Sequence, residues 1–173
     1  MFKNIFQKIN LIANHKYYWL ALVIIGVGME ASALLYQHVG GDEPCILCIH
    51  VRLWVICFSL LAALTYFIQQ LKRILPAIHL VNTAIMFGLL DTSWELLQTE
   101  RGNIMGSCSF DLGMPEWFAI DKWLPAIFEV RASCAESPEL LFGITMAESL
   151  VAFSVGMVVM STILTMSAIF TRR

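Results

Sequence analysis

The feature that most constrains this chain is a set of four apolar stretches, each close to the length that crosses a lipid bilayer. They cover about residues 17–36, 49–68, 74–90 and 149–171. A helix needs roughly 20 apolar residues to span the hydrocarbon core of a membrane. The connections between the first three stretches are short, so these helices should be antiparallel neighbours. The sequence therefore predicts an all-α integral membrane protein, with a four-transmembrane-helix bundle as a single membrane domain over residues 1–173.

Composition excludes the other broad classes of protein. The chain is 58% apolar and 14% charged, whereas a soluble domain is roughly 45–50% apolar and about 25% charged. Disordered chains combine low hydrophobicity with high net charge, which this composition does not match. A net charge of −2 offers no electrostatic attraction for a phosphate backbone. We therefore expect contact with the lipid bilayer and no nucleic-acid partner.

The basic residues predict the orientation of the bundle. Lysine and arginine concentrate in the short cytoplasmic loops of membrane proteins. An even number of spans places seven basic residues on one face: Lys3, Lys8, Lys16, Lys72, Arg73, Arg172 and Arg173. We therefore expect both termini in the cytoplasm, and the loops at about residues 40–45 and 91–148 on the outer side.

The first span has a second interpretation, as a secretory signal. Its basic flank, its apolar run and the Ala-Ser-Ala at residues 31–33 resemble a signal peptide with a cleavage site. Against this, the apolar run continues to Tyr36, and Glu30 would lie just before the cut. We expect an uncleaved span, and the other three spans have the same topology in either case.

Four of the five cysteines fall on the predicted outer side: Cys45, Cys48, Cys108 and Cys134. Cysteines in such compartments tend to be oxidised, and four of them allow three pairings. Cys45 and Cys48 have the C-x-x-C spacing of redox-active dithiols. Cys108 and Cys134 are far enough apart to close the long loop or to exchange with another pair. Two interpretations stay open at this point: a redox enzyme, or a non-enzymatic assembly or transport subunit with two structural disulfides.

Other cysteine chemistry fits less well. Haem attachment needs a histidine directly after the C-x-x-C, where this chain has Ile49. Zinc sites with this motif usually carry it twice, and the chain has it once. We therefore expect no metal. Cys57, deep in the second span, is most simply a small core residue.

Two features favour redox chemistry. Cys48 lies where the second span begins, and the N-terminus of a helix stabilises a thiolate. Arg52 follows one turn later on the same face, where it can support that thiolate and donate hydrogen bonds to a ligand oxygen. An arginine inside a span is costly and indicates function, although it can also extend to the lipid headgroups. Glu30, at a comparable depth, either pairs with Arg52 or reaches the interface.

An aromatic-rich stretch occupies residues 114–128, between Cys108 and Cys134. Pro115 suits the start of a helix, and Trp117 and Trp123 are typical of a short helix in the membrane interface. The alternative is a loop packed against the bundle.

Taken together, these motifs resemble the DsbB family of bacterial inner-membrane disulfide oxidoreductases. The resemblance covers nearly the whole chain, and its most specific element is the order of two outward cysteine pairs on four spans. The matching residues are Glu30, Gln37-His38-Val39, Pro44-Cys45-Ile46-Leu47-Cys48-Ile49, Arg52, Cys108, Pro115-Glu116-Trp117, Asp121-Lys122-Trp123 and Cys134-Ala135-Glu136. It implies a multi-pass protein of the bacterial inner membrane with its active loops in the periplasm.

The resemblance also implies catalytic roles for all four outer cysteines. A reduced periplasmic DsbA-like thiol oxidase would attack Cys108, and the released Cys134 would exchange with Cys45. Cys48 would then face a membrane quinone, ubiquinone or menaquinone, as a thiolate supported by Arg52. Cys48 and Arg52 would thus form the cofactor-binding site. Each exchange between sulfurs is a thiolate attack governed by pKa and access, and electrons would leave through the quinone to the respiratory chain.

Two positions depart from the family pattern. The third span of the family often ends in Glu-His near the quinone, whereas this chain has Trp94-Glu95-Leu96 and leaves only Glu95 as a candidate contact. Val51 stands where an acidic residue is common, which predicts an Arg52 that is freer to serve Cys48.

Overall fold

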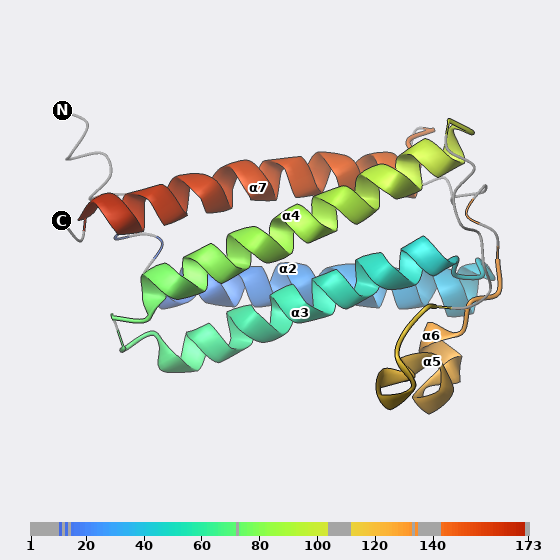
Figure 1. Cartoon of the computed structure of the whole chain (residues 1–173), viewed down its shortest axis with the longest axis horizontal. Coiled ribbons are helices and arrows are strands. Elements are labelled where there is room, and N and C mark those ends of the chain that lie inside the picture. The colour runs from blue at the N-terminus through green and yellow to red at the C-terminus, as the bar shows by residue number, and fades with distance from the viewer. Residues whose placement is uncertain are drawn as a thin grey trace.

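Four long helices make up most of the computed structural model, which describes residues 11, 13, 15–71, 73–103, 112–132, 134 and 143–171. They are α2 (Lys16–Leu35), α3 (Ile46–Ile68), α4 (Leu75–Glu100) and α7 (Met146–Thr171). Each is long and apolar enough to cross a membrane, and they lie alongside one another (Figure 1). The described residues form no β-strand. The predicted four-helix membrane bundle is confirmed.

The helices pack in chain order. α2 packs on α3, α3 on α4, and α4 on α7, which confirms the antiparallel neighbours expected from the short connections. α2 begins and α7 ends at the same end of the bundle (Figure 1). We call the opposite end, where α3 begins and α4 ends, the cysteine end. Its location on the periplasmic side stays a prediction.

α4 is longer than the third predicted span, which stopped at residue 90. The helix continues through Asp91 to Glu100. Packing explains the extension, since Leu96 is buried and Trp54 of α3 donates a hydrogen bond from Nε1 to Thr92 Oγ1 over 3.1 Å. A polar residue ends an apolar run, but it does not break the backbone hydrogen bonds of a helix. The segment between α4 and α7 is correspondingly shorter than the predicted 91–148.

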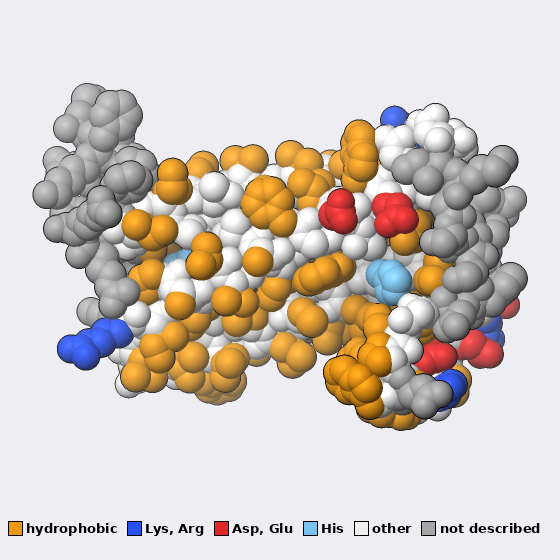
Figure 2. All heavy atoms as spheres, viewed as in Figure 1, with side chains coloured by type: hydrophobic (Ala, Val, Ile, Leu, Met, Phe, Trp, Pro, Cys, Tyr) orange, Lys and Arg blue, Asp and Glu red, His pale blue; other side chains and the backbone are white. Residues whose placement is uncertain are grey.

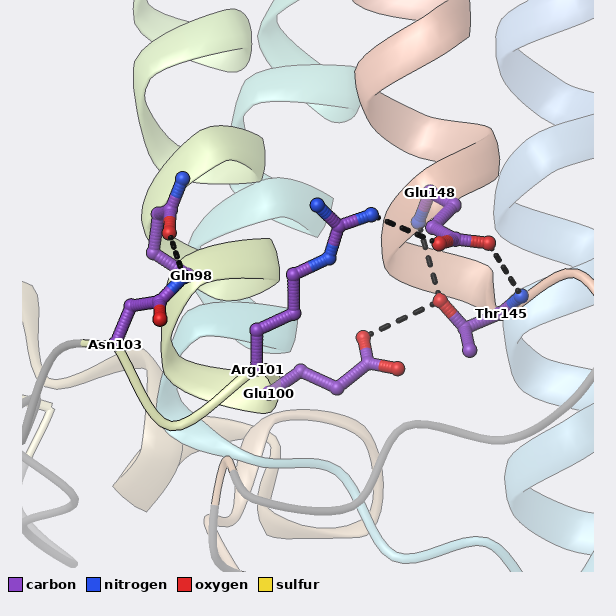
Figure 3. Close-up of polar contacts among 6 residues, drawn as sticks. All are labelled: Gln98, Glu100, Arg101, Asn103, Thr145 and Glu148. Atoms are coloured by element: carbon purple, nitrogen blue, oxygen red, sulfur yellow. Dashed lines mark hydrogen bonds and ion pairs between the residues drawn. The ribbon is translucent and has the colours of Figure 1, made fainter.

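α7 begins at Met146 rather than at residue 149 because a capping box precedes it. The Thr145 Oγ1 accepts a hydrogen bond from the Glu148 backbone N–H over 3.3 Å, and Glu148 Oε2 accepts one from the Thr145 N–H over 3.4 Å. Figure 3 shows how this turn meets the end of α4, where Arg101 pairs with Glu148 at 3.0 Å and Thr145 donates to Glu100. These contacts join the two ends of the long connecting segment.

The outer surface of the bundle is apolar. Figure 2 shows hydrophobic side chains spread over the flank of the helices on the face in view. Ile24, Leu60, Phe67, Phe87 and Val159 are all large, apolar and exposed. Their exposure suits contact with lipid, where apolar surface carries no penalty.

Cys57 lies on this outer surface. It is exposed, and among the described residues it is a free thiol. Its prediction as a core residue is wrong, because every position of an apolar span looks alike in sequence whether it meets lipid or a neighbouring helix. On α3 the inward face carries Val55, Phe58 and Ala62 instead.

A close approach between α3 and α4 depends on Gly88. A Cβ at this position would lie between 2.5 and 2.8 Å from three atoms of the Trp54 ring. Small residues at helix interfaces allow such approaches in membranes, where dispersion contacts hold helices together.

We expect Gly88→Ala to destabilise the protein by about 1–3 kcal/mol, because the rigid indole has to move. Thermal unfolding in detergent measures the effect as a lower Tm. Gly28→Ala is the matched control, since a Cβ there meets nothing within 4 Å and alanine is the better helix former by about 1 kcal/mol. Equal Tm values for the two variants would contradict the proposed packing role of Gly88.

Candidate functional site

The C-x-x-C motif lies at the start of α3. The chain leaves α2 through a π-helical turn, η1 (Tyr36–Gly40). Gly41 ends this turn with a φ of 77°, a left-handed conformation that favours glycine. Cys45 then caps α3, and its Sγ accepts a hydrogen bond from the Cys48 N–H over 3.2 Å. Cys45 and Cys48 form a disulfide, so the predicted dithiol is present in its oxidised form at a helix N-terminus.

A mostly apolar pocket lies beside this disulfide. It is bounded by α2, α3, the end of α4 and the first turns of α7, with side chains such as Met29, Val55 and Leu150. Cys48 also lines it, whereas Cys45 is buried behind. The turn between α2 and α3 closes it through residues such as Tyr36 and Pro44, so the pocket lies where this turn meets the four helices at the cysteine end.

Arg52 brings a positive charge to the same pocket. The residue is only 6% exposed, and its Nη1 donates hydrogen bonds to Gln37 Oε1 over 2.7 Å and to the Ile127 carbonyl over 2.9 Å. This geometry differs from that of an arginine that extends to the headgroups. The structure thus brings Arg52 and Cys48 to one pocket, as their spacing predicts.

Glu30 of α2 lines the pocket as well. The ion pairs formed within the described part of the chain are Arg101–Glu148 and Arg131–Glu129. Glu30 and Arg52 therefore share the pocket without the direct ion pair that one alternative predicts. The other alternative, contact of Glu30 with the membrane interface, stays a prediction.

The aromatic-rich stretch forms three short elements instead of one helix. They are η2 (Glu116–Phe118), α5 (Ile120–Trp123) and α6 (Pro125–Phe128). Pro125 has no N–H for a continuing helix, so α5 ends before it. The segment lies outside the four-helix bundle at the cysteine end (Figure 1).

This segment has two different sides. Phe128 is buried and belongs to the hydrophobic core cluster, whereas Trp117 and Trp123 are 78% and 61% exposed. Packing against the bundle and an outward aromatic surface are therefore both present. Contact of the two tryptophans with the membrane interface stays a prediction.

The chain then passes next to the turn that precedes Cys45. The backbone N–H groups of Arg131 and Ala132 donate to the Pro44 carbonyl over 3.1 and 3.4 Å. Cys134 follows, 1% exposed, in the same buried cluster as Cys45. The structure thus brings the Cys134 segment to the C-x-x-C. The fourth predicted site residue, Cys108, lies outside the described residues.

Two charged residues of this segment, Glu129 and Arg131, are exposed and form an ion pair. Glu129 accepts two hydrogen bonds from the Arg131 guanidinium, over 2.9 and 2.6 Å. This carboxylate raises the pKa of Arg131 above its ordinary value, so the side chain stays cationic at any physiological pH.

Comparison with known proteins assigns the chain to a family. The family model described as "Disulfide bond formation protein DsbB" matches residues 15–164, most of the chain. The chain belongs to the DsbB family. Disulfide bond formation protein B 2 of Pseudomonas aeruginosa is 34% identical over 137 residues, which cover 78% of this chain and 80% of the relative. Disulfide bond formation protein B of Shewanella loihica is 34% identical over 79% of this chain and 81% of the relative. That of Photorhabdus laumondii is 28% identical over 90% and 92%.

DsbB membership makes this a membrane protein of disulfide bond formation. At the two positions that depart from the family pattern, the structure shows what stands there instead. In the Trp94-Glu95-Leu96 stretch it is Leu96 that lines the pocket. Val51 is buried and also lines it, but Arg52 is not left free, because Gln37 and the Ile127 carbonyl engage its guanidinium.

The sequence pattern shared with the DsbB family gives Gln37 no role of its own. Its amide contacts both Arg52 and the backbone of α6. The only sequence signal was its place in the motif that precedes the C-x-x-C. The carbonyl acceptors at Ala126 and Ile127 have no sequence signal, since every residue carries a carbonyl.

Proposed function

We propose that the protein is an inner-membrane protein-disulfide:quinone oxidoreductase. It reoxidises a reduced periplasmic DsbA-like thiol oxidase and passes the electrons to a membrane quinone. The observation that carries this proposal is the oxidised Cys45–Cys48 pair, whose Cys48 borders an apolar pocket that also holds Arg52. Family membership supports it, because a DsbA–DsbB–quinone system keeps the bacterial periplasm oxidising.

The pocket fits a quinone by its chemistry. A quinone head is a flat apolar ring with two carbonyl oxygens, and binding sites for such ligands combine apolar walls with a few polar groups. Here Met29, Val55 and Leu150 supply apolar wall, and Arg52 supplies hydrogen-bond donors. A bound quinone would act as the acceptor of two electrons.

The proposed electron route is a series of thiol–disulfide exchanges. A thiolate of the reduced partner attacks Cys108, forms a mixed disulfide and releases Cys134 as a thiolate. Cys134 attacks Cys45, and Cys48 leaves as a thiolate at the pocket. The second thiolate of the partner then attacks the mixed disulfide and releases Cys108, and Cys108 attacks Cys134 and releases Cys45. Cys45 and Cys48 re-form their disulfide by giving two electrons and two protons to a bound quinone. In sum, the partner dithiol gives up two electrons and two protons and becomes a disulfide, and quinone becomes quinol.

Local structure prepares Cys48 for this role. The unpaired N–H groups and positive dipole end of α3 favour a thiolate at its first turn. Arg52, one turn further along α3, adds a full positive charge at the same pocket. Both effects make Cys48 the better leaving group and lower the cost of holding its charge beside apolar walls.

A direct test mixes the purified protein, a reduced DsbA-like partner and a water-soluble short-chain benzoquinone, and follows the quinone absorbance. We expect one quinone consumed for each partner dithiol oxidised. A partner that becomes oxidised without loss of quinone, or an absorbance that does not respond to the partner, would refute the proposal. Running the assay from quinol and oxidised partner tests for a reductase that works in the opposite direction.

A further inference from the structure

Gln37 joins three parts of the site that are far apart in sequence. It lies in the π-helical turn η1. Its Oε1 accepts a hydrogen bond from Arg52 Nη1 on α3 over 2.7 Å, and its Nε2 donates to the Ala126 carbonyl on α6 over 3.1 Å. The same Nη1 of Arg52 donates to the neighbouring Ile127 carbonyl over 2.9 Å. The three contacts form a closed set between η1, α3 and α6.

The amide side chain of Gln37 satisfies both of its neighbours because it carries an acceptor and a donor. The guanidinium offers donors alone and needs an acceptor, whereas the Ala126 carbonyl is an acceptor and needs a donor. A carboxylate at this position would satisfy Arg52 and oppose the carbonyl. An apolar side chain would satisfy neither. Its place in a π-helical turn also fits a specialised role, since such turns occur frequently at functional sites.

The same contacts bear on the position of Cys134. α6 leads directly into the segment whose Arg131 and Ala132 N–H groups bind the Pro44 carbonyl next to Cys45. Holding α6 at Arg52 therefore also holds the backbone that carries Cys134 beside the C-x-x-C. The Gln37 amide and the Arg52 guanidinium together link the pocket to the Cys134 segment.

We propose that Gln37 is a positioning residue that fixes the Arg52 guanidinium at the pocket and ties α6, and with it the Cys134 segment, to the C-x-x-C turn. The kinetic effects expected from this role of Gln37 rest on the proposed function. Its effect on the position of α6 and the Cys134 segment does not. Loss of Gln37 should affect the quinone end of the reaction through Arg52. The encounter of the partner with Cys108 should not depend on it.

The first test measures amide hydrogen exchange in peptides that cover residues 124–132. In Gln37→Leu, which removes both hydrogen bonds at similar volume, we expect exchange about tenfold faster than in the wild type. Gln98→Leu is the matched control. It makes the same chemical change at the same end of the bundle, where Gln98 contacts Asn103 (Figure 3), and should leave the exchange of residues 124–132 unchanged. Unchanged exchange in Gln37→Leu would overturn the proposal.

The second test uses Gln37→Glu to separate the hydrogen bond with Arg52 from the hydrogen bond with the Ala126 carbonyl. Glutamate keeps an acceptor for Arg52 and loses the donor to Ala126. We expect fast exchange, as in Gln37→Leu, together with a KM for a water-soluble benzoquinone that rises less than in Gln37→Leu, because glutamate still holds the Arg52 guanidinium in place. Gln37→Leu should raise that KM about tenfold and leave the KM for the reduced partner unchanged.

A general loss of stability would look different. If Gln37→Leu lowered kcat and Tm together and changed both KM values alike, Gln37 would be merely structural and the positioning role would be overturned. If the wild type itself reduced no quinone, the proposed function would fail. In that case the amide exchange rates of residues 124–132 alone decide whether Gln37 ties α6 to the C-x-x-C turn.

Discussion

Replacing Cys48 by alanine is expected to reduce partner-dependent quinone reduction by at least about a thousandfold, the scale of losing a reacting nucleophile. Cys48 is the member of the disulfide that lines the pocket. Without it, no thiolate is released beside Arg52. Cys45→Ala should have a similarly large effect for a different reason, because on the proposed route Cys134 then has no disulfide to attack. Quinone absorbance after addition of reduced partner measures both losses.

Cys57→Ala provides the control for these two variants. Cys57 lies on the same helix, is exposed on its outer surface, and is a free thiol among the residues that the structure describes. We expect a wild-type rate from this variant. Normal turnover in either Cys45→Ala or Cys48→Ala would show that electrons do not pass through the C-x-x-C.

Arg52→Met is expected to raise the KM for quinone by roughly 10–100-fold, the scale of losing a hydrogen bond to a charged group. Methionine keeps much of the buried packing and removes the charge. It also removes the donors for Gln37 Oε1 and the Ile127 carbonyl. The KM for the reduced partner should change much less, because on the proposed route the partner reacts at Cys108. Steady-state kinetics with each substrate varied in turn measures the two constants.

Arg101→Met is the matched control for Arg52→Met. Arg101 lies at the exposed end of α4 and pairs with Glu148, and exposed ion pairs contribute little. Both KM values should stay at wild type in this variant. An Arg52→Met protein with an unchanged quinone KM, or with equal increases in both constants, would contradict a role for Arg52 in quinone binding.

The parts of the structure that sequence could predict depend on local signals. The length of each apolar run predicts the four helices, and short connections predict which helices are neighbours. The position of the C-x-x-C at the start of an apolar run predicts a helix N-terminus. The spacing of Cys48 and Arg52 predicts a shared face. Each of these signals lies within a few residues of the feature that it describes.

The parts that sequence could not predict depend on packing between distant segments. The end of α4 was misplaced because its polar turns are held by contacts such as that of Trp54 with Thr92. The outward direction of Cys57 follows from how much of α3 its neighbours cover. Arg52 is engaged by the Ile127 carbonyl, 75 residues away, and a backbone carbonyl gives no sign in a sequence of what it will bind.

The place of the pocket within the bundle has a consequence for the proposed quinone, which is a lipid-soluble ligand. The pocket has mostly apolar walls and lies among helices whose outer surfaces are apolar as well. A ligand dissolved in lipid would then partition into the protein from the membrane phase, without crossing water. The concentration that governs its binding would be its mole fraction among the lipids. Detergent added to a reaction would dilute that ligand even at constant volume.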